Sequence, residues 1–173
     1  LAGSDALATA KALAAAIKDL DYDLIFTGQR GIDEDNGIVG AGIAEFLGIP
    51  QLSLIIKVDV AEDGKSVKVM RPVEGQALII ESVLPALITT QKGLNEPRYA
   101  SLPGIMKAKK KPLDEKTPAD LGIDASECGE GARKVKILEI TPPPGRQGGK
   151  IIDGETPQEK AAELAKMLHD EAK

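Results

Sequence analysis

The sequence predicts an α/β protein built on a doubly wound, mostly parallel β-sheet. Residues 5 to 19 place apolar side chains at helical spacing, and residues 23 to 26 ("DLIF") form a short apolar run that suits a buried parallel strand. A glycine-rich loop follows, and a second helix covers residues 37 to 47, where Gly48 and Pro50 end it. This order of helix, strand, loop and helix is typical of open α/β sheets, in which ligands bind beyond the carboxyl ends of the strands.

Length and composition exclude several classes of protein. The 173 residues suffice for one domain with additional arms or linkers. A net charge of -5 argues against a general nucleic-acid binder, because phosphate contacts need broad clusters of Lys and Arg, and the basic run from Lys107 to Lys111 is short. Cys128 is the only cysteine, which excludes an internal disulfide and favours a reducing cytoplasm.

Targeting signals are also missing from the sequence. No run approaches the ~20 apolar residues of a membrane span, and no charged leader precedes an apolar core, so we expect a soluble, unsecreted protein without membrane insertion. Because the chain starts at Leu1, without Met and almost directly on a helix, we expect that upstream residues are absent.

The first helix is expected to begin after Ser4, a residue type that favours the N-cap position. Its sheet-facing side chains are predicted to be Leu7, Leu13, Ala14 and Ile17, which recur at helical spacing. Four further strands are predicted beyond the second helix, at residues 52–60, 66–71, 77–82 and 86–90. Asp63-Gly64 is a turn signal that makes the first two of these strands a hairpin.

The later part of the chain is less regular. Residues 91–112 read as a protruding segment with one short helix capped by Ser101, and Thr117-Pro118 opens a helical turn. Residues 134–140 ("KVKILEI") resemble a further strand. The α/β domain is therefore expected to span residues 1–141.

A C-terminal arm is predicted over residues 142–173. Pro142 to Pro144 favour an extended polyproline stretch, and Thr156-Pro157 caps a last helix over residues 157–170. Apolar residues share one face of this helix, which suggests that it docks on another surface. They are Ala161, Leu164, Ala165 and Leu168.

The loop at residues 27–40, "TGQRGIDEDNGIVG", is the candidate ligand site. A strand that ends in glycines and leads into a helix directs several backbone N–H groups to one point, where the helix dipole favours an anion such as phosphate. Asp33, Glu34 and Asp35 would repel phosphate, so they must point away, cap the helix or bind ribose hydroxyls. A capped helix behind a tight loop is the alternative, because neither the Rossmann nor the P-loop glycine pattern is present.

Catalytic and metal sites are not predicted. Counted from Asp33, an EF-hand would need Gly and Glu where the chain has Ile38 and Ala44, so a calcium loop is excluded. His169, the single histidine, lies on the polar side of the last helix. Two Phe, two Tyr and no Trp leave little with which to stack a flavin, so a large redox cofactor needs help from another chain.

Two stretches carry a resemblance to a known family. Residues 94–112, "LNEPRYASLPGIMKAKKKP", resemble the recognition loop of the electron transfer flavoprotein beta subunit, and residues 27–40 resemble the nucleotide loop of that family. The resemblance extends over nearly the whole chain, and the family has further strands and helices before the position of Leu1. It implies a Rossmann-like, adenine-nucleotide-binding α/β fold whose N-terminal part is absent here.

The resemblance also implies a function. The chain would be the non-catalytic partner of an alpha subunit that holds most of an FAD, and it would bind AMP, or a second FAD in the electron-bifurcating branch. Such a heterodimer carries electrons from acyl-CoA dehydrogenases or related flavoenzymes, as in fatty acid oxidation, to a downstream acceptor.

The family's functional positions can be carried over residue by residue. The nucleotide loop corresponds to Gly28, Gln29, Arg30, Gly31, Ile32, Asp33, Glu34, Asp35, Asn36, Gly37, Ile38 and Val39. The recognition loop corresponds to Arg98, Tyr99, Ala100, Ser101, Leu102, Pro103, Gly104, Ile105, Met106 and Lys107. The AMP-binding pattern has amide and hydroxyl side chains at positions 37 to 39, where this chain has none. The bifurcating pattern has Gly at 34 and Gln at 38; Val39-Gly40 agrees with that pattern, whereas Glu34 and Ile38 do not.

The recognition loop has the features of a docking element. Pro97 and Pro103 stiffen it, Leu102 can fill a partner's pocket, and the lysines that follow can speed encounter with an acidic surface. Without the resemblance, a stiff turn followed by solvated lysines at the end of a helix would be the preferred explanation.

The sequence leaves two rival functions open. One is a stand-alone adenine-nucleotide-binding sensor of the same fold, which would need neither residues 91–112 nor the arm. The other is a small phosphohydrolase that uses Asp33 and Asp35 on a metal.

Overall fold

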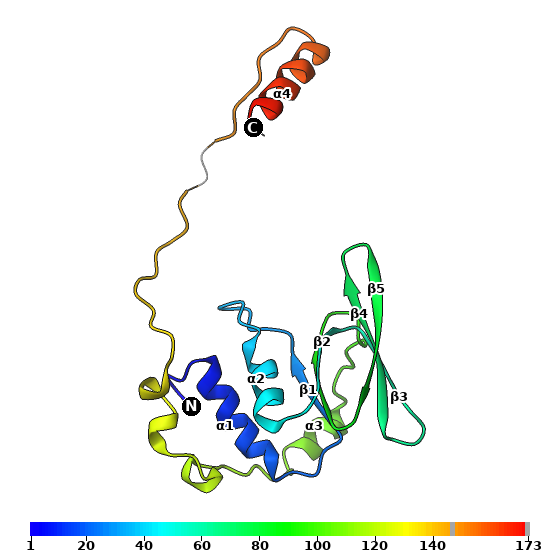
Figure 1. Cartoon of the computed structure of the whole chain (residues 1–173), viewed down its shortest axis with the longest axis vertical. Helices are drawn as coiled ribbons and strands as arrows, with labels where there is room; N and C mark the ends of the chain where they lie inside the picture. The colour runs from blue at the N-terminus through cyan, green and yellow to red at the C-terminus, as the bar shows by residue number, and fades with distance from the viewer. Residues whose placement is uncertain (146–147, 172–173) are drawn as a thin grey trace. The chain divides into compact units, whose positions relative to one another are not determined.

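The computed structural model describes residues 1–145 and 148–171, which fall into two compact units. The first unit ends at Lys136 and the second begins at Ile137. In the first unit, a three-stranded parallel sheet has the order β1-β6-β2, formed by Leu24–Gly28, Ala86–Thr90 and Gln51–Ile55 (Figure 1). The central strand β6 is buried along Ala86 to Thr89, as expected for a strand covered on both faces.

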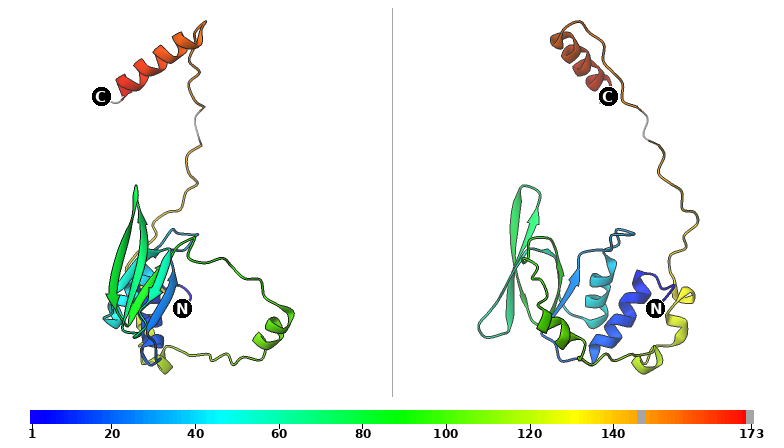
Figure 2. Two further views of the ribbon diagram at one scale, coloured as in Figure 1. Left: turned by 90° about the vertical axis from the view of Figure 1, so that its right-hand side faces the viewer. Right: turned by 180° about the vertical axis from the view of Figure 1, so that it is seen from behind.

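One face of the parallel sheet is covered by two helices, α1 (Ala6–Lys18) and α2 (Ile38–Leu47), which lie side by side in Figures 1 and 2. Leu87 of β6 packs there against Ile43 of α2 and Ala10 of α1. Gly48 ends α2 in the left-handed conformation, as predicted from its position. The helix that was expected between residues 37 and 47 is thereby confirmed.

The other face is covered by an antiparallel sheet instead of a second helical layer. It comprises β3 (Lys57–Val60), β4 (Ser66–Val73) and β5 (Gln76–Val83), in that order. Val67 and Val69 of β4 pack against Ile88 of β6. The α/β class and the parallel sheet are therefore confirmed, whereas the described residues show helices on only one face.

The predicted strand at residues 52–60 is wrong as a single element, because the chain changes sheets within it. The register of β2 against β6 shifts between Leu52 and Ile55, and Leu54 has a φ of 63°. The amide of Leu54 donates to Thr89 Oγ1 at 2.9 Å, and the guanidinium Nε of Arg71 donates to the Ser53 carbonyl at 2.7 Å. These two bonds satisfy backbone groups at the break, where β2 ends and β3 begins.

The start of α1 also differs from the prediction. Asp5, and not Ser4, is the N-cap, and its carboxylate accepts the amide of Ala8 at 2.9 Å. Ser4 Oγ instead accepts the amide of Gly129 at 2.8 Å. The hydroxyl is thus engaged by a distant segment, which leaves capping to the next residue.

The buried side of α1 is made of alanines. Leu7 and Leu13 are 41% and 36% exposed, so the prediction that they form the covered face is wrong. A Cβ on Gly42 of α2 would lie 2.7 Å from the Cβ of Ala10, which shows how closely the two helices approach. Larger residues would not fit this contact. The alanines concerned are Ala8, Ala10, Ala12 and Ala14.

The segment after the sheets contains short turns. Thr117-Pro118 opens a 3₁₀ turn over Ala119–Leu121, and two more follow at Ala125–Glu127 and Glu130–Ala132. The strand predicted at residues 134–140 is wrong, because none of the described residues pairs with this segment in a β-ladder and its side chains, such as Val135 at 65%, are exposed. A sequence with strand propensity needs a partner to form a ladder.

The second unit contains α4 (Pro157–Glu171), which confirms the helix predicted from residue 157 onward. The Thr156 hydroxyl accepts the amide of Glu159 at 3.3 Å, and the Glu159 carboxylate accepts the Thr156 amide at 3.4 Å. This reciprocal pair is a capping box. Among the helices that the structure describes, none is long and apolar enough to cross a bilayer.

Candidate functional site

The glycine-rich loop lies at the carboxyl end of β1, beside the end of β6. The Thr90 hydroxyl donates to the Thr27 carbonyl at 3.0 Å and ties the two strand ends together. A shallow pocket of about 220 Å³ opens there, between the strand end and the start of α2. Its lining comprises Thr27, Gly28, Gln29, Arg30, Gly31, Asn36, Gly37, Val39 and Gly40. Seven of the twelve nucleotide-loop residues named from the sequence are therefore brought together in one pocket.

Gly40 sets how closely α2 approaches the sheet. A Cβ on Gly40 would lie 2.7 Å from Thr27 Oγ1 and 2.9 Å from Thr89 Cγ2, closer than side chains can pack. Thr27 Oγ1 is itself buried and has no hydrogen-bond partner among the described residues. The missing side chain at position 40 thus allows the amino end of α2 to lie directly over the end of β1.

The acidic part of the loop is held by internal contacts. Arg30 pairs with Asp35 at 2.9 Å, and the Gly31 amide donates to the Asn36 carbonyl at 3.1 Å, which closes the loop. Asp33 accepts the amide of Glu34 at 2.9 Å. One of the three carboxylates is therefore neutralised by a guanidinium, as an anion site requires, and none of the three caps α2.

The amino end of α2 retains free donor capacity. Gly37 is its N-cap and makes no side-chain cap bond, while Asn36 Oδ1 accepts the amide of Ile38 at 3.0 Å. The amides of Val39 and Gly40 follow in the first turn, at the positive end of the helix dipole. Ile32, at 103% exposure, and Ile38, at 54%, lie outside the pocket lining.

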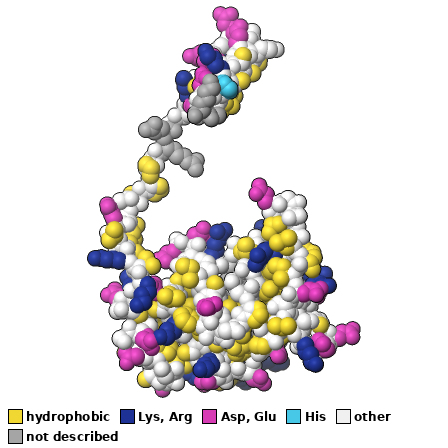
Figure 3. All heavy atoms as spheres, in the orientation of Figure 1, with side chains coloured by type: hydrophobic (Ala, Val, Ile, Leu, Met, Phe, Trp, Pro, Cys, Tyr) yellow, Lys and Arg dark blue, Asp and Glu magenta, His cyan; other side chains and the backbone are white. Residues whose placement is uncertain are grey.

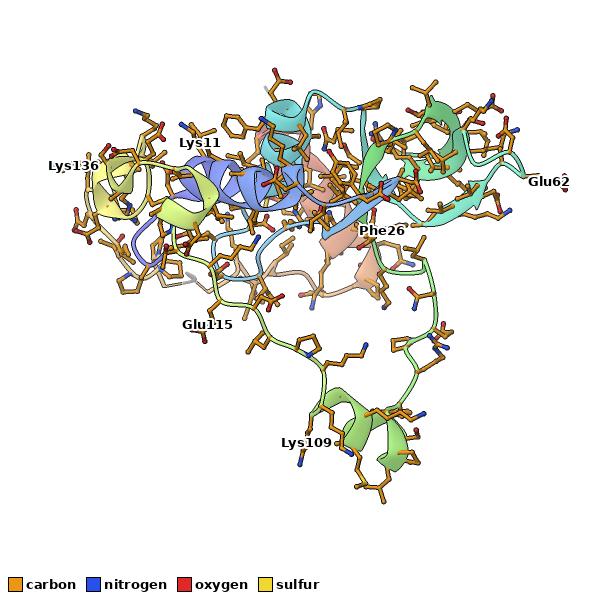
Figure 4. The ribbon with its side chains drawn as sticks, turned by 90° about the horizontal axis from the view of Figure 1, so that it is seen from below. Lys11, Phe26, Glu62, Lys109, Glu115 and Lys136 are labelled. Carbon is orange, nitrogen blue, oxygen red and sulfur yellow. The ribbon has the colours of Figure 1, made fainter. Side chains whose placement is uncertain are left out.

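The second predicted site is the protruding segment. The short helix α3 (Leu102–Ala108) begins at Ser101, whose hydroxyl accepts the Gly104 amide at 3.2 Å, as predicted. Figures 2 and 4 show α3 away from both sheets, at the end of two extended segments. Leu102 is 72% exposed, so it is not part of the hydrophobic interior.

The surface around α3 combines apolar and basic side chains. Tyr99 is fully exposed and Met106 is 60% exposed, while Lys109 projects from the end of the helix in Figure 4. The ten predicted partner-binding residues are all exposed. On the face of the first unit drawn in Figure 3, Lys and Arg lie among Asp and Glu, which does not resemble a broad phosphate-binding surface.

One feature of the candidate site was not anticipated from the sequence, namely the close approach of α2 to the sheet at Gly40. In the sequence, Gly40 is only a residue with low helix propensity, and its close contact with Thr27 and Thr89 depends on how α2 crosses the sheet.

Within residues 1–145 and 148–171, no three His, Cys, Asp or Glu side chains are grouped to hold a metal ion. Asp33 and Asp35 are accordingly not part of such a group in the described residues.

The family model and the curated relatives that match this chain name the same family. The model of the electron transfer flavoprotein domain matches residues 1–121. An electron transfer flavoprotein subunit beta of Bacillus subtilis is 45% identical over 157 residues, which are 91% of this chain and 59% of that protein. The corresponding subunit of Bradyrhizobium diazoefficiens is 40% identical over 96% of this chain and 61% of its own length.

A further relative carries a different name. The Caffeyl-CoA reductase-Etf complex subunit CarD of Acetobacterium woodii is 36% identical over 97% of this chain and 64% of its own length. The chain thus spans about three fifths of the length of these curated relatives. The family model covers more than half of the chain, and the relatives named beta subunits match nearly all of it, so the chain belongs to the electron transfer flavoprotein family, in the group of its beta subunits.

Proposed function

We propose that the chain acts as the beta subunit of an electron transfer flavoprotein, a carrier without catalytic residues of its own. Membership of the family is the observation that carries this proposal, and it implies involvement of a flavin. With two Phe, two Tyr and no Trp, the chain has few aromatic side chains to enclose an isoalloxazine. An alpha subunit therefore holds most of the FAD, and this chain supports it in a cytoplasmic heterodimer.

The loop at the end of β1 is the proposed nucleotide site. Glycine backbone at Gly28, Gly31 and Gly37 allows close approach of a ligand, and the first-turn amides of α2 favour a negative charge. The ion pair with Arg30 neutralises the Asp35 carboxylate, which would otherwise repel the negative charge of the ligand. Backbone amides thus replace the amide and hydroxyl side chains that relatives are expected to use at positions 37 to 39.

We propose AMP as the nucleotide, with a second FAD as the alternative, and this chain supplies only part of the site. The pocket, with a volume of about 220 Å³, is smaller than the ~300 Å³ at which ordinary small-molecule pockets begin. It can hold a phosphate and part of a ribose, with the base lying beyond it.

The exposed helix α3 is the proposed docking element for electron donors of the acyl-CoA dehydrogenase type. Leu102 supplies an apolar anchor that no interior contact engages, since 72% of it is exposed. Lys107, Lys109, Lys110 and Lys111 supply positive charge beside it, which raises the rate of encounter with an acidic rim. A stand-alone sensor would gain nothing from an exposed leucine on a projecting helix and four lysines in and just after that helix.

Co-expression with an alpha subunit tests the proposal. A tag on this chain is used to purify the complex, whose absorbance spectrum is recorded before denaturation and whose released nucleotides are separated by chromatography. We expect a flavin spectrum, one FAD and one AMP per heterodimer. A chain that stays monomeric and flavin-free beside candidate alpha subunits would contradict the proposal. Two FAD and no AMP per heterodimer would show that the second nucleotide is FAD.

A further inference from the structure

The dipeptide Asn36-Gly37 lies at the junction between the glycine-rich loop and α2. An asparagine followed by glycine is chemically labile, because the glycine nitrogen can reach the side-chain amide carbon without obstruction from a β-carbon. Asn36 is half-buried and Gly37 is exposed. The other asparagine of the chain, Asn95, is followed by Glu96.

The local hydrogen bonds favour this reaction at Asn36. Asn36 Oδ1 accepts the amide of Ile38 at 3.0 Å, which holds the side chain folded along the backbone that contains the Gly37 nitrogen. The same N–H would stabilise the negative charge that develops on Oδ1 as the nitrogen attacks, and the positive end of α2 adds to this effect. Among the described residues, no acceptor engages the Gly37 N–H, so this nitrogen is free to react.

We propose that Asn36 is a site of spontaneous deamidation. The Gly37 nitrogen loses its proton and bonds to Asn36 Cγ, the bond from Cγ to Nδ2 breaks, and the amide nitrogen leaves as ammonia. Water then opens the succinimide ring, at Cγ to give aspartate or at the backbone carbonyl to give isoaspartate. The net reaction consumes one water and releases one ammonia, with no oxidation or reduction.

The product changes the charge and the connectivity of the loop. A new carboxylate at position 36 would lie at the amino end of α2. There its negative charge would oppose binding of a phosphate at the proposed site. In isoaspartate the backbone carbonyl that accepts the Gly31 amide becomes part of that carboxylate, and the main chain gains a methylene group. This functional consequence rests on the proposed nucleotide site, whereas the chemical conversion does not.

Peptide mass mapping of the purified full chain tests the conversion. The chain is aged in mildly alkaline buffer and digested, and the peptides containing Asn36 and Asn95 are followed in the same samples. We expect the Asn36 peptide to gain the mass of an amide-to-acid exchange and to split into two isomers, while the Asn95 peptide stays unchanged. Equal rates at the two asparagines, or no conversion at Asn36, would overturn the proposal.

Gly37→Ala is the matched variant. The φ of Gly37 is -103°, which alanine adopts, and an added Cβ would meet only the Gln29 carbonyl at 3.3 Å and Arg30 Cβ at 3.9 Å. A β-carbon at this position should slow conversion at Asn36 by about tenfold or more. An undiminished rate in this variant would contradict the mechanism. Should the variant unfold, the comparison of Asn36 with Asn95 in the unaltered chain still decides.

AMP binding to fresh and aged heterodimer tests the consequence. We expect weaker binding after ageing, and equally weak binding in freshly made Asn36→Asp. Equal affinity of fresh and aged protein, despite conversion, would overturn the proposed effect on the site. If fresh heterodimer binds no AMP, the proposed nucleotide function fails, and the mass data still decide the modification.

Discussion

Arg30 and Asp35 close the glycine-rich loop through a two-point ion pair, with Nε 2.9 Å from Oδ1 and Nη1 3.1 Å from Oδ2. Both side chains are largely exposed, at 51% and 71%, so the pair contributes only ~0–1 kcal/mol to stability. Its geometry is more important than its energy, because it turns one acidic side chain of the loop toward a guanidinium. Asp35 adopts a left-handed backbone conformation, with a φ of 54°, in doing so.

Arg30→Lys is predicted to weaken AMP binding without destabilising the protein. Lysine keeps the charge but cannot form the planar two-point contact, so the Asp35 carboxylate is released beside the anion site. We expect a several-fold higher Kd for AMP by calorimetry on the heterodimer. The free energy of unfolding should change by less than about 1 kcal/mol.

The control for Arg30→Lys is a variant that breaks another exposed ion pair. Lys57 and Asp59 lie 3.0 Å apart on β3, outside the loop, so Lys57→Ala should leave AMP affinity unchanged. Equal AMP affinities in the Arg30 and Lys57 variants would show that the loop pair has no role in binding.

Gly40→Ala is predicted to destabilise the fold. The new methyl group would overlap Thr27 Oγ1 and Thr89 Cγ2, and relief requires α2 to move off the sheet, at a cost of about 1–3 kcal/mol. Chemical denaturation measures this loss. Gly131→Ala, where nothing lies within 4 Å of the added atom, should change stability by no more than about 0.5 kcal/mol.

A double variant tests the contact itself. Thr27→Ala removes one overlapping atom and the unpaired buried hydroxyl, so Gly40→Ala should be less damaging in that background. Strictly additive losses of stability would mean that the two positions do not interact.

Asp5→Asn is predicted to reduce the pH dependence of stability. The pKa of the Asp5 carboxyl is lowered from its ordinary value of 3.8 by hydrogen bonds from the amides of Ala8 and Lys134. Because the folded-state pKa is lower than the unfolded one, the stabilisation is present above about pH 4 and is lost as the pH falls through the folded value. Thermal unfolding across this range should show wild type and variant converging in acid. A constant difference would contradict this account.

Leu164→Ser combined with Leu168→Ser is predicted to weaken association with the alpha subunit. These exposed side chains, four residues apart on α4, share one face and leave the second unit with an apolar stripe to bury. Gel filtration should show less heterodimer, with helix content by circular dichroism retained. Lys166→Ala, on the opposite side of α4, is the control, and an equal loss with it would argue against the stripe.

The elements that the sequence predicted best are set by neighbouring residues. Gly48 ends α2, Ser101 begins α3 and Thr156 begins α4, and each of these signals acts within one helical turn. The hairpin of β3 and β4 was also predicted, from Asp63-Gly64, where Gly64 has a φ of 67°. At such turns and caps, the residue types at a few adjacent positions determine the local backbone, so they can be predicted from the sequence.

The elements that failed depend on partners far along the chain. Ser4 is engaged by Gly129, and the predicted strand at 52–60 breaks where Leu54 bonds Thr89, so neither could be read from its own segment. The same holds for the site. The loop was located by its glycines, but the close contact of Gly40 with Thr27 appears only when α2 lies on the sheet.

Leu102→Ala gives the most direct test of the proposed carrier role. Rapid-mixing kinetics would follow flavin reduction in the heterodimer by a reduced flavoenzyme of the acyl-CoA dehydrogenase type. We expect docking weakened by about 2 kcal/mol and slower reduction, with flavin content and thermal stability unchanged, because Leu102 is an exposed anchor. Leu113→Ala, at another exposed leucine, should behave as wild type. Unchanged reduction of the Leu102 variant would contradict the docking role of α3.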